Sequence, residues 1–210
     1  MTSGRERAYE FLKDTVLSDP DMQGQFINEQ ELADRIGVSR TPIREALLML
    51  AAEDLIRLLP KKGAFVPSLS PREIGELFEL RKLLECYAAT EMIRRHLPDA
   101  LAGMSDAFTQ QQELVRHPGK AREFIEQDRL FHVALVGSLG NQLITRIYDG
   151  LRNRQIITGV TAVYLEEKRR QAVIVEHEAI LDALRTGNVN LVQETIATHL
   201  DATVRVLLAR

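Results

Sequence analysis

The sequence predicts a mostly α-helical protein, in which an N-terminal winged helix-turn-helix is followed by an all-α antiparallel helical bundle. Apolar residues recur every three or four positions along most of the 210-residue chain, as they do in amphipathic helices. Strand-like patterning is confined to one short stretch, residues 55–67. The sequence SLSP at Ser68–Pro71 then ends the first part of the chain.

The first two helices of the N-terminal part are indicated by spacing and by end signals. The segment RERAYEFLKDTVL, residues 5–17, has helical apolar spacing and stops at the turn SDPDMQG. In the next segment, NEQELADRIG, Asn28 is a candidate N-cap and Glu31 completes a capping-box pattern. Gly37 is a typical helix terminator, so we expect a short helix that ends there.

The third helix and a hairpin complete the N-terminal part. Ser39 or Thr41 can cap the helix, and Pro42 falls in its first turn, where no intrahelical N–H bond is lost. The segment LIRLLPKKGAFVP, residues 55–67, consists of two short apolar runs around a basic turn, which predicts a small hairpin. The order helix, helix, turn, helix, hairpin is that of a winged helix-turn-helix.

The second part shows helical periodicity throughout. Breaks are expected at Pro98, at residues 117–119, at residues 140–141, near Gly159 and at residues 187–188. Short connections between helices are typical of an antiparallel bundle. The six predicted helices lie within residues 73–96, 99–117, 121–140, 142–157, 161–187 and 190–210.

Composition and charge restrict the class of protein. A hydrophobic content of 45% with 27% charged residues is that of an ordinary globular protein. The chain has no apolar run long enough to span a membrane and no apolar N-terminal signal, so we expect a cytoplasmic protein. The single cysteine, Cys86, cannot form an intramolecular disulfide.

Positive charge is clustered although the net charge is -3. The segment from Arg35 to Arg44 contains arginines and no acidic residue, although the helix N-terminus within it disfavours cations. In a helix-turn-helix the second helix enters the major groove with its N-terminus first. Arginine can grip guanine or phosphate with two donors, hydroxyls can donate to phosphates, and a wing tip of Lys61, Lys62 and Gly63 can approach the backbone. The pattern therefore predicts operator DNA as a partner.

The segment NEQELADRIGVSRTPIREALLMLAAEDLIRLLPKKGAFV resembles the winged helix-turn-helix of the GntR family of bacterial transcription regulators. The resemblance covers about the first third of the chain. One departure is Gln30, where many relatives carry an arginine that contacts DNA. Together, the cluster and the resemblance predict these DNA-binding residues: Gln30, Arg35, Ser39, Arg40, Thr41, Arg44, Lys62 and Gly63.

A second polar cluster is expected inside the bundle. Asp128 and His132 lie four residues apart on an apolar helix face. His177 and His199 lie on apolar faces of two helices joined at residues 187–188, equally far from that turn, so an antiparallel hairpin brings them to one height. Unpaired buried polar groups are costly, which favours convergence of the four. Spacing alone leaves open a metal site, a surface ion pair or hydrogen-bonded core histidines.

The segment DRLFHVAL, followed by GN and by a histidine in each of the last two helices, resembles the FCD domain of FadR-type GntR regulators. The resemblance implies that a small carboxylate effector binds at one divalent metal ion. The donor set favours Zn and also admits Ni, Mn or Fe. The metal ligands implied are Asp128, His132, His177 and His199.

Arg81 is a candidate effector-binding residue. It shares a helix face with Leu77 and Ala88, and in similar proteins an arginine on this helix meets the carboxylate of the effector. The alternative is an arginine at the rim of the bundle with its charged head in water.

These observations predict a DNA-binding transcription repressor, a homodimer, that responds to a small organic acid and is not an enzyme. The alternatives are a metal-dependent enzyme and a regulator with a purely structural metal. The GxSxG elbow, the zinc-protease HExxH pattern and a glycine-rich phosphate loop are all missing from the sequence. The expected domains are residues 1–68 for DNA binding, a linker over 69–75, and residues 76–210 for metal and effector binding.

Overall fold

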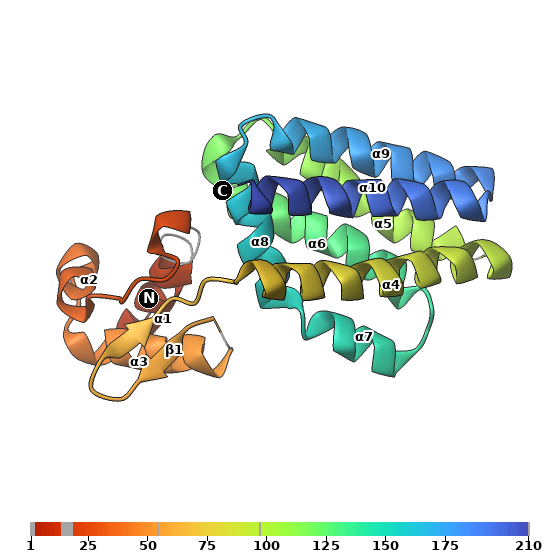
Figure 1. Cartoon of the computed structure of the whole chain (residues 1–210). Coiled ribbons are helices and arrows are strands. Elements are labelled where there is room, and N and C mark those ends of the chain that lie inside the picture. Colours follow the sequence, from red (N-terminus) through yellow and green to blue (C-terminus); the bar gives the residue numbers. More distant parts are fainter. Residues whose placement is uncertain (1–2, 14–18, 54, 97, 210) are drawn as a thin grey trace. The chain divides into compact units, whose positions relative to one another are not determined.

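A computed structural model describes residues 3–13, 19–53, 55–96 and 98–209. The chain divides into two compact units, Met1–Ser68 and Leu69–Arg210. The predicted fold class is confirmed: a winged helix-turn-helix precedes an all-α bundle (Figure 1).

The three helices of unit 1 are α1 (Gly4–Phe11), α2 (Glu29–Ile36) and α3 (Arg40–Ala52). The Asn28 side chain caps α2 by accepting from the backbone N–H groups of its first turn, and Gly37 ends the helix with φ 71°. Ser39 occupies the N-cap position of α3, in extended backbone conformation. The predicted end of the first helix falls on residues 14–18, which lie outside the described residues.

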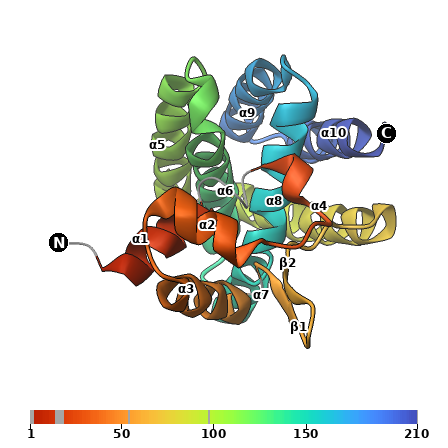
Figure 2. The ribbon, with the colours of Figure 1, turned by 90° about the vertical axis from the view of Figure 1, so that its left-hand side faces the viewer.

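The wing is a two-stranded antiparallel hairpin, β1 (Arg57–Leu59) and β2 (Gly63–Phe65), which projects from the three helices (Figure 2). Lys61 and Gly63 take positive φ values of 65° and 96°, which turn the chain sharply at the tip. The backbone of Ile27 donates to the carbonyl of Ala64 at 2.8 Å. The segment before α2 therefore pairs with the outer side of the hairpin.

An apolar core joins the helices of unit 1 to the wing, because each helix buries one stripe. The stripe of α3 consists of Ile43, Ala46, Leu47 and Leu50, all 2% exposed or less. The remaining core residues are Ala8, Leu12, Ile27, Leu32, Ala33, Leu55, Ile56, Ala64 and Val66.

Unit 2 contains seven α-helices among its described residues instead of the six predicted. Helices α9 and α10 lie side by side and run in opposite directions, as expected (Figure 1). The helices are α4 (Pro71–Arg95), α5 (Pro98–Leu114), α6 (Ala121–Gly137), α7 (Gln142–Asp149), α8 (Arg152–Leu165), α9 (Arg169–Thr186) and α10 (Val189–Leu208), with a 3-10 turn, η3 (Pro118–Lys120), before α6.

The predicted break near Gly159 is wrong, because this glycine lies inside α8. The breaks occur at residues 150–151 and 166–168 instead. A Cβ atom at Gly159 would lie 2.6 Å from Cγ2 of Ile125 in α6. The glycine therefore permits close packing of two helices and does not end one.

The stretch expected as a linker, residues 69–75, is helical from Pro71 onward. Helix α4 begins at Pro71, because the Ser70 side chain accepts from the Glu73 N–H and the Glu73 carboxylate accepts from the Ser70 N–H. This reciprocal capping box starts the helix as soon as the chain leaves unit 1.

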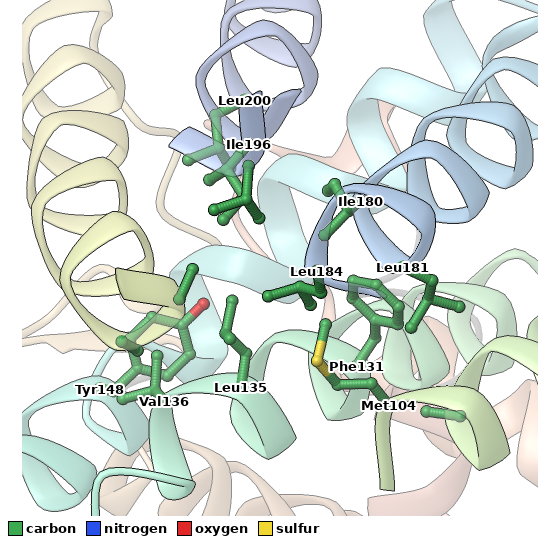
Figure 3. Packing of buried hydrophobic residues seen from close by; sticks show 14 of the residues in the cluster. Met104, Phe131, Leu135, Val136, Tyr148, Ile180, Leu181, Leu184, Ile196 and Leu200 are labelled. Atoms are coloured by element: carbon green, nitrogen blue, oxygen red, sulfur yellow. The ribbon is translucent and has the colours of Figure 1, made fainter. Parts of the chain in front are cut away.

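The main core of the bundle is formed by apolar side chains from all the long helices. Phe131 and Leu135 of α6, Ile180 of α9 and Leu200 of α10 all belong to this core (Figure 3). A smaller cluster around Phe124 lies between α6, α8 and α9. In the described part of the chain, no helix has both the length and the apolar composition needed to cross a lipid bilayer.

We expect Gly159→Ala to destabilise unit 2, because the new methyl group would overlap the β-branched side chain of Ile125. The overlap should cost about 1–3 kcal/mol and be offset by up to about 1 kcal/mol of helix propensity. The matched control is Gly75→Ala in α4, where a Cβ meets nothing within 4 Å and propensity should raise stability. Urea unfolding followed by circular dichroism compares the two. Equal stabilisation of both variants would contradict the close packing.

Candidate metal centre and DNA-facing surface

Four predicted residues come together between α6, α9 and α10. One ligand atom from each of Asp128, His132, His177 and His199 lies within 4.8 Å of all the others. Nε2 of His132 and Nε2 of His199 are 3.2 Å apart, and Nε2 of His177 lies 3.4 Å from Oδ1 of Asp128. The three histidines are buried, and the Asp128 side chain is 15% exposed.

The outer nitrogen of each imidazole faces an oxygen that can accept a hydrogen bond but has no proton to donate. Nδ1 of His177 lies 2.8 Å from Oε1 of Gln111, and Nδ1 of His199 lies 2.7 Å from a Glu176 carboxylate oxygen. Nδ1 of His132 lies 2.8 Å from Oε2 of Glu85, an ion-pair contact without an aligned hydrogen bond. Because these oxygens have no proton to donate, they favour the tautomer in which Nδ1 carries the hydrogen and Nε2 offers a lone pair to the centre.

The Nε2 atoms of the three histidines have the arrangement expected of a cation site. Nε2 of His177 is buried and has no hydrogen-bond partner among the described residues. The Nε2 atoms of His132 and His199 would direct two lone pairs at one another across 3.2 Å, which is unfavourable unless a cation accepts both. Three imidazole nitrogens and one carboxylate can hold Zn, Ni, Mn or Fe.

The electrostatics favour the neutral forms of His177 and His199. Burial lowers the pKa of His177 well below its usual value, and the neighbouring rings of His199 and His132 lower it further. Burial also lowers the pKa of His199, against the opposing effect of Glu176. The ring of Phe131 stacks on His177 with centroids 4.1 Å apart and fixes its plane. Neutral, oriented imidazoles are the form that binds metal ions.

Arg81 is buried beside this cluster, so the rim alternative is wrong. Its side chain is 6% exposed, and its Nε donates to Oε1 of Glu85 at 2.8 Å. The hydroxyl of Tyr148 donates to the same oxygen at 2.6 Å. Burial alone would raise the pKa of Glu85, but Arg81 and His132 lower it below the usual range, so Glu85 is ionised.

Sequence reasoning missed the residues that orient the histidines. Glu176 accepts from both terminal nitrogens of buried Arg169, at 2.6 and 2.8 Å, and contacts His199. Glu85 follows Arg81 by four residues, a spacing that could have revealed this pair. No comparable pattern marks Gln111, whose partner lies 66 positions away.

The predicted DNA-binding residues of unit 1 are all exposed. Ser39, Arg40, Thr41 and Arg44 occupy the N-cap and first turns of α3, and Lys62 and Gly63 lie at the wing tip. Gln30 donates to Asp34 at 3.0 Å, and Arg35 lies over the ring of Phe11. Sequence reasoning also missed Glu29, which contacts Arg40 and Arg44.

We expect Glu85→Gln to lower the free energy of unfolding of the chelator-treated chain by about 3–5 kcal/mol, because buried Arg81 would lose its counter-charge. The matched control is Glu76→Gln, which breaks the Arg72–Glu76 pair in the same helix. That pair has the same four-residue spacing and the same 2.8 Å distance, with side chains 87% and 58% exposed. Its loss should cost less than about 0.5 kcal/mol in urea unfolding. Similar losses in both variants would refute the importance of burial.

The fold and the two sites define the class of protein, a DNA-binding transcription regulator with a separate all-helical domain. Comparison with known families agrees. The FCD domain matches residues 76–202, and the model for bacterial regulatory proteins of the gntR family matches residues 5–66. The chain therefore belongs to the GntR family, in the group with an FCD domain, and is not an enzyme. Members of this family bind operator DNA and are typically dimers.

Individual relatives give the same family. The chain is 30% identical to the gluconate operon transcriptional repressor of Bacillus licheniformis, over 85% of this chain and 74% of that protein. Its identity to the gluconate operon transcriptional repressor of Bacillus subtilis is 28%, over 95% of this chain and 83% of that protein.

Among solved structures, a GntR transcriptional regulator from Rhodococcus sp. RHA1 superimposes with a TM-score of 0.72 at 22% identity, over the whole of both chains. E. coli McbR/YncC gives a TM-score of 0.69 at 22% identity, over 100% of this chain and 99% of that one. At this identity, the likeness supports the fold alone.

Proposed function

We propose that the chain is a repressor whose affinity for operator DNA is changed by a small organic acid bound at a divalent metal in unit 2. The observation that carries this proposal is the convergence of three imidazole nitrogens and one carboxylate within 4.8 Å. Asp128, His132, His177 and His199 would hold the ion. A bound divalent ion would supply open coordination positions for the carboxylate of the acid.

The DNA-binding half of the proposal rests on exposed donors at the start of α3 and at the wing. Arg40 and Arg44 would contact bases or phosphates in the major groove, and Ser39 and Thr41 would donate to phosphates. The sugar-phosphate backbone of the DNA would be contacted by the remaining predicted residues, Gln30, Arg35, Lys62 and Gly63. Two such units in a homodimer would address two half-sites of an operator.

Arg81 would assist effector binding from α4. Its Nε donates to Glu85, and the other carboxylate oxygen of Glu85 contacts His132, so Arg81 is one residue removed from a candidate ligand. A guanidinium in that position favours a negatively charged ligand. Two relatives are named gluconate operon transcriptional repressors, so gluconate and other hydroxy acids are the first ligands to test.

The mechanism is a shift between two arrangements of the bundle. An acid that binds one arrangement more tightly would populate it, and the linked helix-turn-helix units would change their fit to the operator. The four residues lie on three helices, so a small displacement of α9 or α10 would change the distances from His177 or His199 to the other ligands. By linkage, operator DNA and acid must change each other's affinity by the same factor.

We expect one acid from a panel of hydroxy, keto, sugar and dicarboxylic acids to raise the melting temperature of the metal-loaded chain, because a ligand of the folded state stabilises it. Metal stripping should abolish the shift. Asp128→Asn should weaken metal binding at least about tenfold in chelator competition, while Asp182→Asn, which removes a charge from the α9 surface, should not.

The variant Arg81→Lys distinguishes acid binding from metal binding. It keeps the charge but not the two-pronged geometry, so it should bind metal normally and lose most of the acid-dependent shift. If stripping lowers the melting temperature and no acid raises it, the metal is structural. If stripping has no effect, the four residues do not hold a metal.

We expect the acid found in this way to change operator affinity by about 5- to 150-fold, the usual range of allosteric coupling. Fluorescence anisotropy with a duplex selected by the unaltered chain measures this ratio, and the reverse titration must return the same factor. Asp128→Asn should retain DNA binding and lose the response. Equal operator affinity with and without saturating acid would refute the regulatory mechanism.

A further inference from the structure

Glu29 is the first residue of α2, and its carboxylate reaches the recognition helix α3. Oε2 of Glu29 accepts from Nε of Arg44 at 2.8 Å and from Nη2 of Arg40 at 3.0 Å. The Glu29 side chain is 20% exposed, whereas the side chains of Arg40 and Arg44 are 52% and 61% exposed. One recessed carboxylate thus holds two arginines that project from the surface.

This contact opposes a repulsion within α3. Arg40 and Arg44 are four residues apart, a spacing that brings two like charges together on one helix face. Burial by itself would raise the pKa of Glu29, but the hydrogen bonds from Arg44 and Arg40 outweigh it, so the pKa is lowered and the carboxylate is ionised. Its position at the N-terminus of α2 is also favourable for an anion.

The contact with Glu29 uses an atom of Arg44 that is not needed for pairing with a base. Arg44 is held through Nε, and no described residue accepts a hydrogen bond from its two terminal nitrogens. Those two nitrogens form the fork that pairs with O6 and N7 of guanine. Holding Nε restricts the plane of the guanidinium before DNA arrives, which reduces the side-chain entropy lost on binding. Arg40 uses one terminal nitrogen and has no such free fork.

We propose that Glu29 is a positioning residue for sequence-specific DNA recognition, which presents Arg44 to a guanine and disfavours its diversion to phosphates. The negative charge of Glu29 lies close to the DNA-facing surface and repels phosphate, so it weakens non-specific binding while the oriented fork strengthens specific binding. This inference rests on the proposed DNA-binding role of α3.

The test compares specific with non-specific affinity in the full-length chain. A preferred duplex is selected from a random-sequence library with the unaltered chain, and its affinity is compared with that of an unrelated duplex of equal length at two salt concentrations. Glu29→Gln should reduce the ratio of the two affinities about tenfold and relax the preference at one guanine, because the fork is no longer held. Non-specific affinity should stay equal or rise.

Two further variants are compared with Glu29→Gln. Glu31→Gln removes a negative charge two residues after Glu29, in the same turn of α2. It should change the specific and the non-specific affinity by one common factor. Glu29→Asp keeps the charge but shortens the reach, so it should also lower the ratio. Circular dichroism checks that each variant is folded.

Arg44→Ala separates the two levels of the proposal. One outcome is that Arg44→Ala brings the ratio of specific to non-specific affinity to about one while Glu29→Gln and Glu29→Asp behave like Glu31→Gln. That outcome refutes the positioning role of Glu29 and leaves sequence recognition by α3 standing. If Arg44→Ala leaves the ratio unchanged, the proposed role of α3 itself is wrong. The inference is supported if the ratio of specific to non-specific affinity falls in both Glu29 variants and stays the same in Glu31→Gln.

Discussion

The interior of the bundle depends on one constraint: a charge removed from water must meet an opposite charge or a hydrogen-bond partner, because an unpaired one costs several kcal/mol. Glu85 is fully buried and contacts Arg81 on its own helix, His132 on α6 and Tyr148 on α7. Apolar packing alone tolerates many similar arrangements, whereas polar contacts with directional geometry select one. The buried charges therefore set the relative positions of the helices that carry the candidate ligands.

The two units use charge in opposite ways. In unit 1 the core is apolar, and the arginines of α3 lie on the surface, where solvent screens them until a polyanion displaces it. In unit 2 Arg81 and Arg169 are buried and paired with Glu85 and Glu176, each of which also contacts a histidine. The candidate ligands are therefore surrounded mainly by charged and hydrogen-bonding groups, with the ring of Phe131 as an apolar neighbour of His177.

Local signals predicted most elements, and they failed where packing overrides them. Asn28 and Gly37 bound α2 as expected, because capping depends only on neighbouring backbone groups. Glycine is a poor helix former, so the sequence predicts a break near Gly159, yet α8 continues through it. Its reason lies in Ile125, which is 34 positions away and cannot be recognised from the sequence around the glycine.

By itself, the sequence determined the helical class, the winged helix-turn-helix and the expected convergence of four polar residues, because periodicity, caps and equal distance from a turn are properties of the chain alone. That these four are candidate metal ligands came from the resemblance to the FCD domain. Only the tertiary structure decided which groups surround those ligands. Glu85, Gln111 and Glu176 reach the histidines from three different helices, and Glu29 reaches Arg44 from the neighbouring helix. Such contacts join residues far apart in sequence, so no local pattern marks them, and burial and geometry arise only when the helices pack.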